Sequence, residues 1–382
     1  MSVSFGVFLT CFMITLFLTV YLHLLIHRTP AFFERTIKFS IIGILIILIR
    51  MVIPINFPFT HTIYSYQVLP RIIDFTTTPV PNTNWVLSDL FIGIISIVAI
   101  ILLIRFVVQH LRLHNALSQF YVKGSEKYAY LYECISNYYK KPVQIAVIPQ
   151  PISPAITGLV KPVLILPDTT NLTPEELKYI CQHEIMHYKK HHILFVLIME
   201  IVCRIHWWNP CVQYLKKEFA LFLELTNDFF LIYSAPQFDT LNYADLILKT
   251  AKNIHSGKRT TPSFLMNFAI NNSSILTTRI NFILNNQRQI KHKSNIYCTI
   301  SNLIISIAVF CSIFFVIEAD FEVLEPLPED IVEIREDNAY LIKNENGYLI
   351  YVDGEYFAEI DHLPDEFKNI QIYEEGDIPN EN

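Results

Sequence analysis

The sequence HEIMH at residues 183–187 combines residue types and a spacing that can bind a metal ion and activate water. Residues four apart lie on one face of a helix, so His183 and His187 could both direct a ring nitrogen at one ion. Zinc accepts imidazole nitrogens at about 2.0–2.1 Å and lowers the pKa of bound water to about 7. Glu184 lies where its carboxylate could take the proton of that water. The motif therefore predicts a zinc site for attack on a peptide carbonyl.

The residues before the motif predict that it lies on a helix. Thr173 suits the N-cap and Pro174 the first helical position, and two glutamates follow in the first turn. The alternative is a chance match in a chain that holds 13 histidines. The helix start favours a metal site.

A third ligand is predicted on a second helix. Glu224 and Asp228 are four residues apart and so share a helix face. Glu224 could bind the ion, and Asp228 could bind the far nitrogen of a ligand histidine and fix its orientation. An ordinary polar helix face is the alternative for this pair, and Glu218 is a rival ligand.

Two further histidines follow the motif, His191 and His192. Three residues spaced by four spread over roughly 12 Å of helix axis, which is too far for one ion. We expect both to be surface or membrane-interface residues.

The composition predicts a membrane protein, since 52% of the 382 residues are hydrophobic and only 17% are charged. Four apolar runs predict transmembrane helices at about residues 5–26, 39–54, 86–108 and 296–317. A further apolar run at 193–214 is interrupted by Glu200 and Arg204. We interpret it as a helix buried in a domain or dipping into the membrane rather than as a fifth span.

The basic residues predict how these spans are oriented. The positive-inside rule places 27–38 and 109–295 in the cytoplasm, and the Pro/Thr-rich loop 55–84 and the tail 318–382 outside the cell. From Glu318 onward the chain holds 20 acidic and three basic residues. The sequence thus predicts a multi-pass protein of the cell membrane with a cytoplasmic domain and an acidic extracellular tail.

Short alternating apolar segments predict two small sheets. Before the motif, Pro154 suits an edge strand, and an edge strand beside the zinc helix could hold a substrate chain extended. In the tail, Asp353-Gly354 lies between alternating runs, a hairpin signal. We expect a β-meander of three or four strands there.

Together these residues resemble the BlaR/MecR antirepressor metallopeptidases, which are integral membrane zinc peptidases. The matching segments are 153–158, 161–167, 172–177, 183–187, 207–210 and 224–228. The resemblance implies Zn²⁺ held by His183, His187 and Glu224, with Glu184 as the base and Asp228 behind the ligands.

The predicted fold is mainly α. The sequence patterns predict four transmembrane helices and a small C-terminal β-meander at 318–382, and the resemblance implies a cytoplasmic α+β gluzincin-like zinc peptidase domain at 109–295. The beta-lactam receptors of the family carry a large penicillin-binding sensor after the last span. Only about 65 residues follow it here, without an SxxK sequence, so we do not expect beta-lactam sensing.

The resemblance implies that an extracytoplasmic signal makes the peptidase cleave a cytoplasmic regulator, with a winged-helix repressor as candidate substrate, and it leaves self-cleavage open. The other partner is the lipid bilayer; we expect no direct nucleic-acid binding and leave a homodimer open. Two alternatives remain: a membrane quality-control metalloprotease, and a receptor whose zinc site is not catalytic. The open coordination position and the adjacent base of the motif favour catalysis.

Overall fold

The computed structural model describes most of the chain. The described residues are 5–27, 34–52, 59–66, 68–79, 85–122, 129–150, 152–167, 172–234, 239–256, 273–285, 294–319, 334, 338–344, 347–360, 362–363, 367 and 370–374. They belong to two compact units, Met1–Asp320 and Phe321–Asn382.

The long apolar helices of the first unit are α1 (Phe5–His27), α2 (Glu34–Val52), α4 (Leu87–Leu117) and α12 (Ser294–Phe314). Within the described residues, three stretches are long and apolar enough to cross a membrane: Phe8–His27, Leu87–Phe120 and Ile296–Phe314. The predicted second span lies in α2, which is not among these three, so four spans remain a prediction. The helices are those of a membrane protein.

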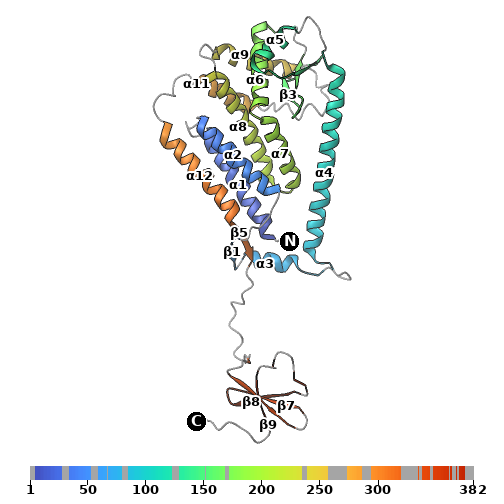
Figure 1. Ribbon diagram of the computed structural model, residues 1–382, viewed down its shortest axis with the longest axis vertical. Coiled ribbons are helices and arrows are strands. Elements are labelled where there is room, and N and C mark those ends of the chain that lie inside the picture. The colour runs from blue at the N-terminus through green and yellow to red at the C-terminus, as the bar shows by residue number, and fades with distance from the viewer. Residues whose placement is uncertain are drawn as a thin grey trace. The chain divides into compact units, whose positions relative to one another are not determined.

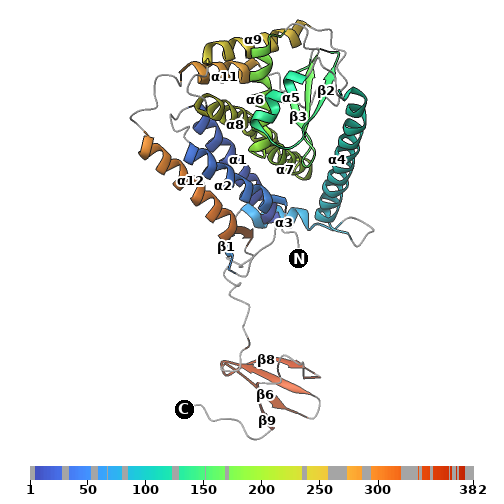
Figure 2. The ribbon, with the colours of Figure 1, turned by 45° about the horizontal axis from the view of Figure 1, so that its top comes forward.

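Three of these helices, α1, α2 and α12, pack side by side (Figure 1). Tyr21 of α1 joins them, because its hydroxyl lies 2.6 Å from Ser40 Oγ of α2 and 3.0 Å from Ser301 Oγ of α12. Such hydroxyl pairs satisfy polar groups between helices in an apolar surrounding. The helix α4 stands apart from this group in both ribbon views and packs against α7 (Figure 2).

At one end of the bundle the chain forms a small cap. Strand β1 (His61–Ser65) pairs in parallel with β5 (Phe315–Ala319), and the short helix α3 (Val68–Thr76) packs against both. The sequence predicted a plain loop at 55–84 and a helix up to residue 317. Both expectations were wrong in this part, because two distant β-branched segments pair with each other.

The other end of the first unit holds the predicted peptidase domain. Its elements are η1 (Ser118–Phe120), α5 (Ala129–Tyr138), β2 (Gln144–Ile148), β3 (Ala155–Thr157), β4 (Val163–Pro167), α6 (Pro174–Lys189), α7 (His192–Ile205), α8 (Pro210–Ser234), α9 (Thr240–Ser256) and α11 (Ser273–Asn285). Strand β4 lies between β2, its parallel neighbour, and β3, its antiparallel neighbour. The short strand β3 is therefore an edge strand of this sheet, and it contacts α6.

The start of α6 has the local structure that the sequence predicts. Thr173 is the N-cap and forms a capping box with Glu176, with the Thr173 N–H donating to the Glu176 carboxylate at 2.7 Å. Glu176 also accepts from Lys249 of α9 at 2.6 Å. The capping box stabilises the helix start, and the Lys249 pair connects α6 to α9.

The apolar run 193–214 does not form a single helix. It is divided between α7 and α8, with a turn at 206–209. Val202 of α7 and Phe222 of α8 belong to the same fully buried core as Leu22 of α1 and Ile47 of α2. Helix α8, which carries Glu224, therefore shares one apolar core with α1, α2 and α7.

The second unit is a four-stranded sheet in the order β8-β7-β6-β9, formed by β6 (Ala339–Lys343), β7 (Tyr348–Val352), β8 (Glu355–Ile360) and β9 (Gln371–Glu374). Strands β6, β7 and β8 form the predicted meander. Asp353 and Gly354 both have positive φ in the turn, as a tight hairpin requires. The fourth strand departs from the meander because β9 pairs in parallel with β6.

Candidate metal centre

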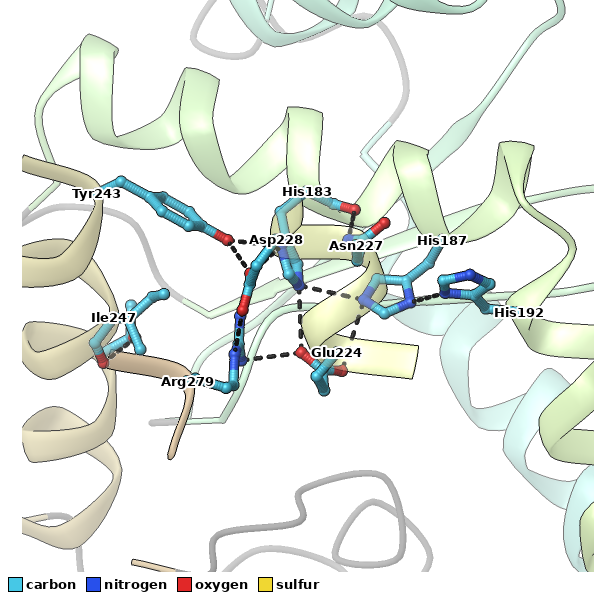
Figure 3. A network of polar contacts seen from close by, with 10 residues as sticks. His183, His187, His192, Glu224, Asn227, Asp228, Tyr243, Ile247 and Arg279 are labelled. Atoms are coloured by element: carbon cyan, nitrogen blue, oxygen red, sulfur yellow. Dashed lines mark hydrogen bonds and ion pairs between the residues drawn. The ribbon is translucent and has the colours of Figure 1, made fainter. Parts of the chain in front are cut away.

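The structure brings three of the predicted site residues together. His183 and His187 lie on α6 and Glu224 lies on α8, and their ligand atoms converge (Figure 3). The two Nε2 atoms are 3.1 Å apart. The Glu224 carboxylate oxygens lie 3.4 Å from Nε2 of His183 and 3.5 Å from Nε2 of His187.

These separations fit a small tetrahedral ion. Ligand atoms held at about 2.0–2.1 Å from zinc lie roughly 3.3 Å from one another. Both histidines use the same nitrogen, and three protein ligands leave one position open for water or substrate. The donor set can therefore hold a divalent metal in an open site, and zinc suits two imidazoles and a carboxylate.

Glu184, the next residue of α6, lines the same cavity as the three ligand residues. The backbone N–H of Ile156 on β3 hydrogen-bonds its carboxylate. Burial, with a contribution from the negative charge of Glu224, raises the pKa of Glu184 to about 7. A carboxyl with such a pKa can exchange protons near neutral pH, which a general base must do.

Asp228 lies behind the ligand histidine, where the sequence predicted it, and a tyrosine hydroxyl contacts both side chains. It is fully buried, and its Oδ1 lies 3.5 Å from His183 Nδ1. The hydroxyl of Tyr243 on α9 lies between them, 2.7 Å from each atom (Figure 3). With a metal on Nε2, the His183 Nδ1–H donates to the Tyr243 oxygen, and the Tyr243 O–H donates to Asp228. Asp228 can thus orient His183 both by the 3.5 Å ion pair and through the shorter hydrogen bonds of Tyr243.

Arg279 on α11 fixes both carboxylates of α8. Its guanidinium donates to both oxygens of Asp228 at 2.9 Å and lies 2.8 Å from Glu224. Although burial opposes ionisation of Glu224, Arg279 and the two histidines hold the pKa of its carboxyl well below the usual range. Glu224 is therefore ionised at neutral pH, as a carboxylate that binds a metal must be.

His192 is part of the centre, contrary to the expectation from sequence. It is buried, and its Nδ1 lies 2.9 Å from Nδ1 of His187. Burial lowers the pKa of His187 to about 4, and burial also lowers that of His192 well below its usual value. Both rings are thus neutral, as a ligand histidine and the acceptor behind it must be.

The reason for this difference is a sharp turn after α6. The helix ends at Lys189, and His191 takes the left-handed conformation with φ 58°. The turn directs His192 back onto the site, while His191 stays exposed as expected. Left-handed backbone at a histidine is uncommon, and no helical periodicity predicts it.

A cavity of about 1000 Å³ opens at the candidate metal centre. It is lined by the three ligand residues and Glu184, by β3, and by residues of α4 and α7 such as Phe106 and Arg204. The Arg204 guanidinium lies over the Phe106 ring at 4.0 Å. The cavity therefore extends from the metal group to the contact between α4 and α7, and its size suits a ligand larger than water.

Glu218, the rival ligand, lies elsewhere. Its carboxylate is 3.1 Å from His23 of α1, and it does not belong to the group around His183. The sequence also missed Tyr243 and Arg279. Each is a common residue type in a helix without a motif, so only the packing of α9 and α11 against α8 shows its role.

The fold and the site together define a membrane protein with two histidines and a glutamate placed to bind a metal ion, as in metallopeptidases. The sequence profile of the BlaR1 peptidase M56 family matches residues 15–283, and the chain belongs to this family of membrane metallopeptidases. The match includes α6, α8 and α9 entirely and ends within α11.

Curated relatives match a shorter stretch. The regulatory protein BlaR1 of Bacillus licheniformis is 32% identical over 98 residues, which is 25% of this chain and 16% of the relative. The methicillin resistance MecR1 protein of Staphylococcus aureus is 27% identical over 115 residues, 30% of this chain and 20% of the relative. The matches thus span a fifth or less of these relatives.

Proposed function

We propose that the chain is a zinc endopeptidase of the cell membrane that acts in signal transduction. The observation that carries the proposal is the convergence of His183, His187 and Glu224 in a cavity that Glu184 also lines. When bound, a zinc ion would supply Lewis-acid chemistry for attack on a peptide carbonyl.

The residues of the chain have distinct roles in this reaction. His183, His187 and Glu224 hold the metal, and Glu184 accepts a proton from the attacking water and returns it to the leaving amine. Tyr243, Asp228 and Arg279 fix the orientation of the ligands. The edge strand β3 offers backbone groups to an extended peptide, which would add to the sheet next to Glu184.

We further propose that the peptidase faces the cytoplasm and that the acidic tail lies outside. Helices α6, α9 and α11 lie at one end of α1, α2 and α12, α8 packs along α1, and β1, β5 and α3 lie at the other end (Figure 1). This arrangement supports opposite sides of the bilayer for the site and for the loop 59–79, as the positive-inside rule predicts.

The substrate is proposed to be a cytoplasmic regulator, with a winged-helix repressor as the candidate, and the chain itself as a second candidate. The test compares new protein N-termini in cells with the wild-type chain and with Glu184→Gln. We expect one or a few regulator fragments that depend on Glu184. Many unrelated Glu184-dependent fragments would instead support quality control, and none at all would support a receptor without catalysis.

A further inference from the structure

A second group of metal-ligand side chains lies on α1 and α8. His23 and His27 of α1 and Glu218 of α8 each offer one ligand atom, and these atoms lie within 4.8 Å of one another. His23 Nδ1 is 3.1 Å from Glu218 Oε1, and the two imidazole centroids are 4.6 Å apart. The residue types match those of the candidate metal centre, which also has two histidines four apart on one helix and a glutamate on α8.

From this group we infer a second binding site for a divalent transition metal, which connects the first apolar helix to α8. Imidazole nitrogens together with a carboxylate select ions such as Zn²⁺ over Mg²⁺ or Ca²⁺. The i,i+4 spacing holds both rings on one face of α1. The proposal does not depend on the peptidase activity.

Two independent features favour a cation at this place. Glu218 Oε2 is buried and, among the described residues, has no hydrogen-bond partner, a state that an ion would relieve. His27 is the last residue of α1, where the unpaired carbonyls of the helix end carry partial negative charge. Both features leave negative charge that no cation balances close to the two imidazoles.

The existing geometry needs only a small adjustment to hold an ion. Ligand atoms bound to zinc lie roughly 3.3 Å apart, close to the 3.1 Å between His23 Nδ1 and Glu218 Oε1, and the ligand atoms of the whole group lie within 4.8 Å of one another. His23 and His27 are exposed, so their rings can rotate without displacing core residues. Water completes the coordination of such an open site.

The site would connect the membrane bundle to the candidate metal centre. Glu218 and Glu224 lie six residues apart on α8, about 9 Å along the helix axis. Because six residues turn a helix by about 240°, the two glutamates face different neighbours, α1 and α6. An ion at Glu218 would thus fix the end of α1 to the helix that carries Glu224.

The test is the zinc content of the full purified chain. The protein is stripped with a chelator, equilibrated with buffered Zn²⁺ and analysed by atomic emission. We expect two equivalents for the wild type, and one each for Glu218→Gln, His27→Gln and Glu224→Gln. The double variant Glu218→Gln with Glu224→Gln should bind none.

His114→Gln is the matched control, because His114 is an exposed histidine of α4 outside both groups, and it should keep two equivalents. Circular dichroism shows whether each variant keeps its helices. If Glu218→Gln does not fold, His27→Gln still tests the site, because it changes only an exposed side chain. One equivalent in the wild type that Glu224→Gln alone removes, or two in folded His27→Gln, would overturn the proposal.

Discussion

The acidity of Glu184 determines how the proposed activity should depend on pH. Burial raises the pKa of this carboxyl to about 7, and a bound cation beside it would lower that value. The base works only when it is deprotonated. We therefore predict that peptide cleavage rises with pH and reaches half its maximum at or below about pH 7.

The measurement is the cleavage rate of the purified chain as a function of pH, with metal content checked at each point because protons compete for histidine ligands. A rate that does not fall on acidification while the metal remains bound would show that Glu184 is not the base.

Tyr243 connects a ligand to its buried counter-charge, and its loss should weaken the metal site. Tyr243→Phe removes the hydroxyl that lies 2.7 Å from both His183 Nδ1 and Asp228 Oδ1. Loss of a group that hydrogen-bonds a metal ligand typically weakens metal binding about 10–100-fold. We expect a decrease of this size in competition with a coloured chelator.

Tyr132→Phe provides the control for this prediction. It also removes one hydroxyl hydrogen bond, to the Val122 carbonyl at 2.8 Å, but it lies outside the metal group. Equal losses of affinity in the two variants would show a general effect on the fold rather than an effect on His183.

At the scale of elements, β3 positions both Glu184 and the proposed peptide-binding edge. Gly158 ends this strand with φ 89°, and a Cβ there would lie 2.2 Å from the Lys161 carbonyl oxygen. Gly158→Ala must therefore move the turn before β4, at a cost of roughly 1–3 kcal/mol. We expect a lower melting temperature and a reduced cleavage rate.

The zinc content of Gly158→Ala should stay close to that of the wild type, because the ligands lie on α6 and α8. Gly93→Ala is a control on α4, where an added Cβ meets nothing within 4 Å. A normal cleavage rate in Gly158→Ala would show that the position of β3 does not matter for catalysis.

Local patterns in the sequence predict the elements well but not their contacts. The Thr173 cap and the Asp353-Gly354 turn depend on neighbouring residues, and the structure shows both. Tyr243 and Arg279 reach the site from helices that no motif marks. The turn at His191 depends on a backbone conformation that composition does not reveal, so the position of His192 could not be predicted.

At the scale of the whole molecule, the division into two units predicts that each unit folds without the other. The chain changes unit between Asp320 and Phe321, after strand β5 is complete. A chain that ends at Asp320 should therefore keep its zinc content and melting temperature, while its cleavage in cells no longer responds to conditions outside. A shortened chain that does not fold would contradict the prediction that the first unit folds without the second.

The bundle and the peptidase should instead unfold together, because the core that contains Phe222 and Leu22 is continuous between them. A single thermal transition is expected for the shortened chain. This shared core gives a physical route by which a movement of α1 or α2 reaches α8 and the ligand Glu224.

The most direct test of the central claim compares the purified wild-type chain with Glu184→Gln, each loaded with zinc and incubated with a peptide library. The account predicts equal zinc at the His183, His187 and Glu224 group in both proteins, and cleavage by the wild type that falls at least about 100-fold in Glu184→Gln. Undiminished cleavage by Glu184→Gln, or by wild-type protein stripped of metal, would contradict it.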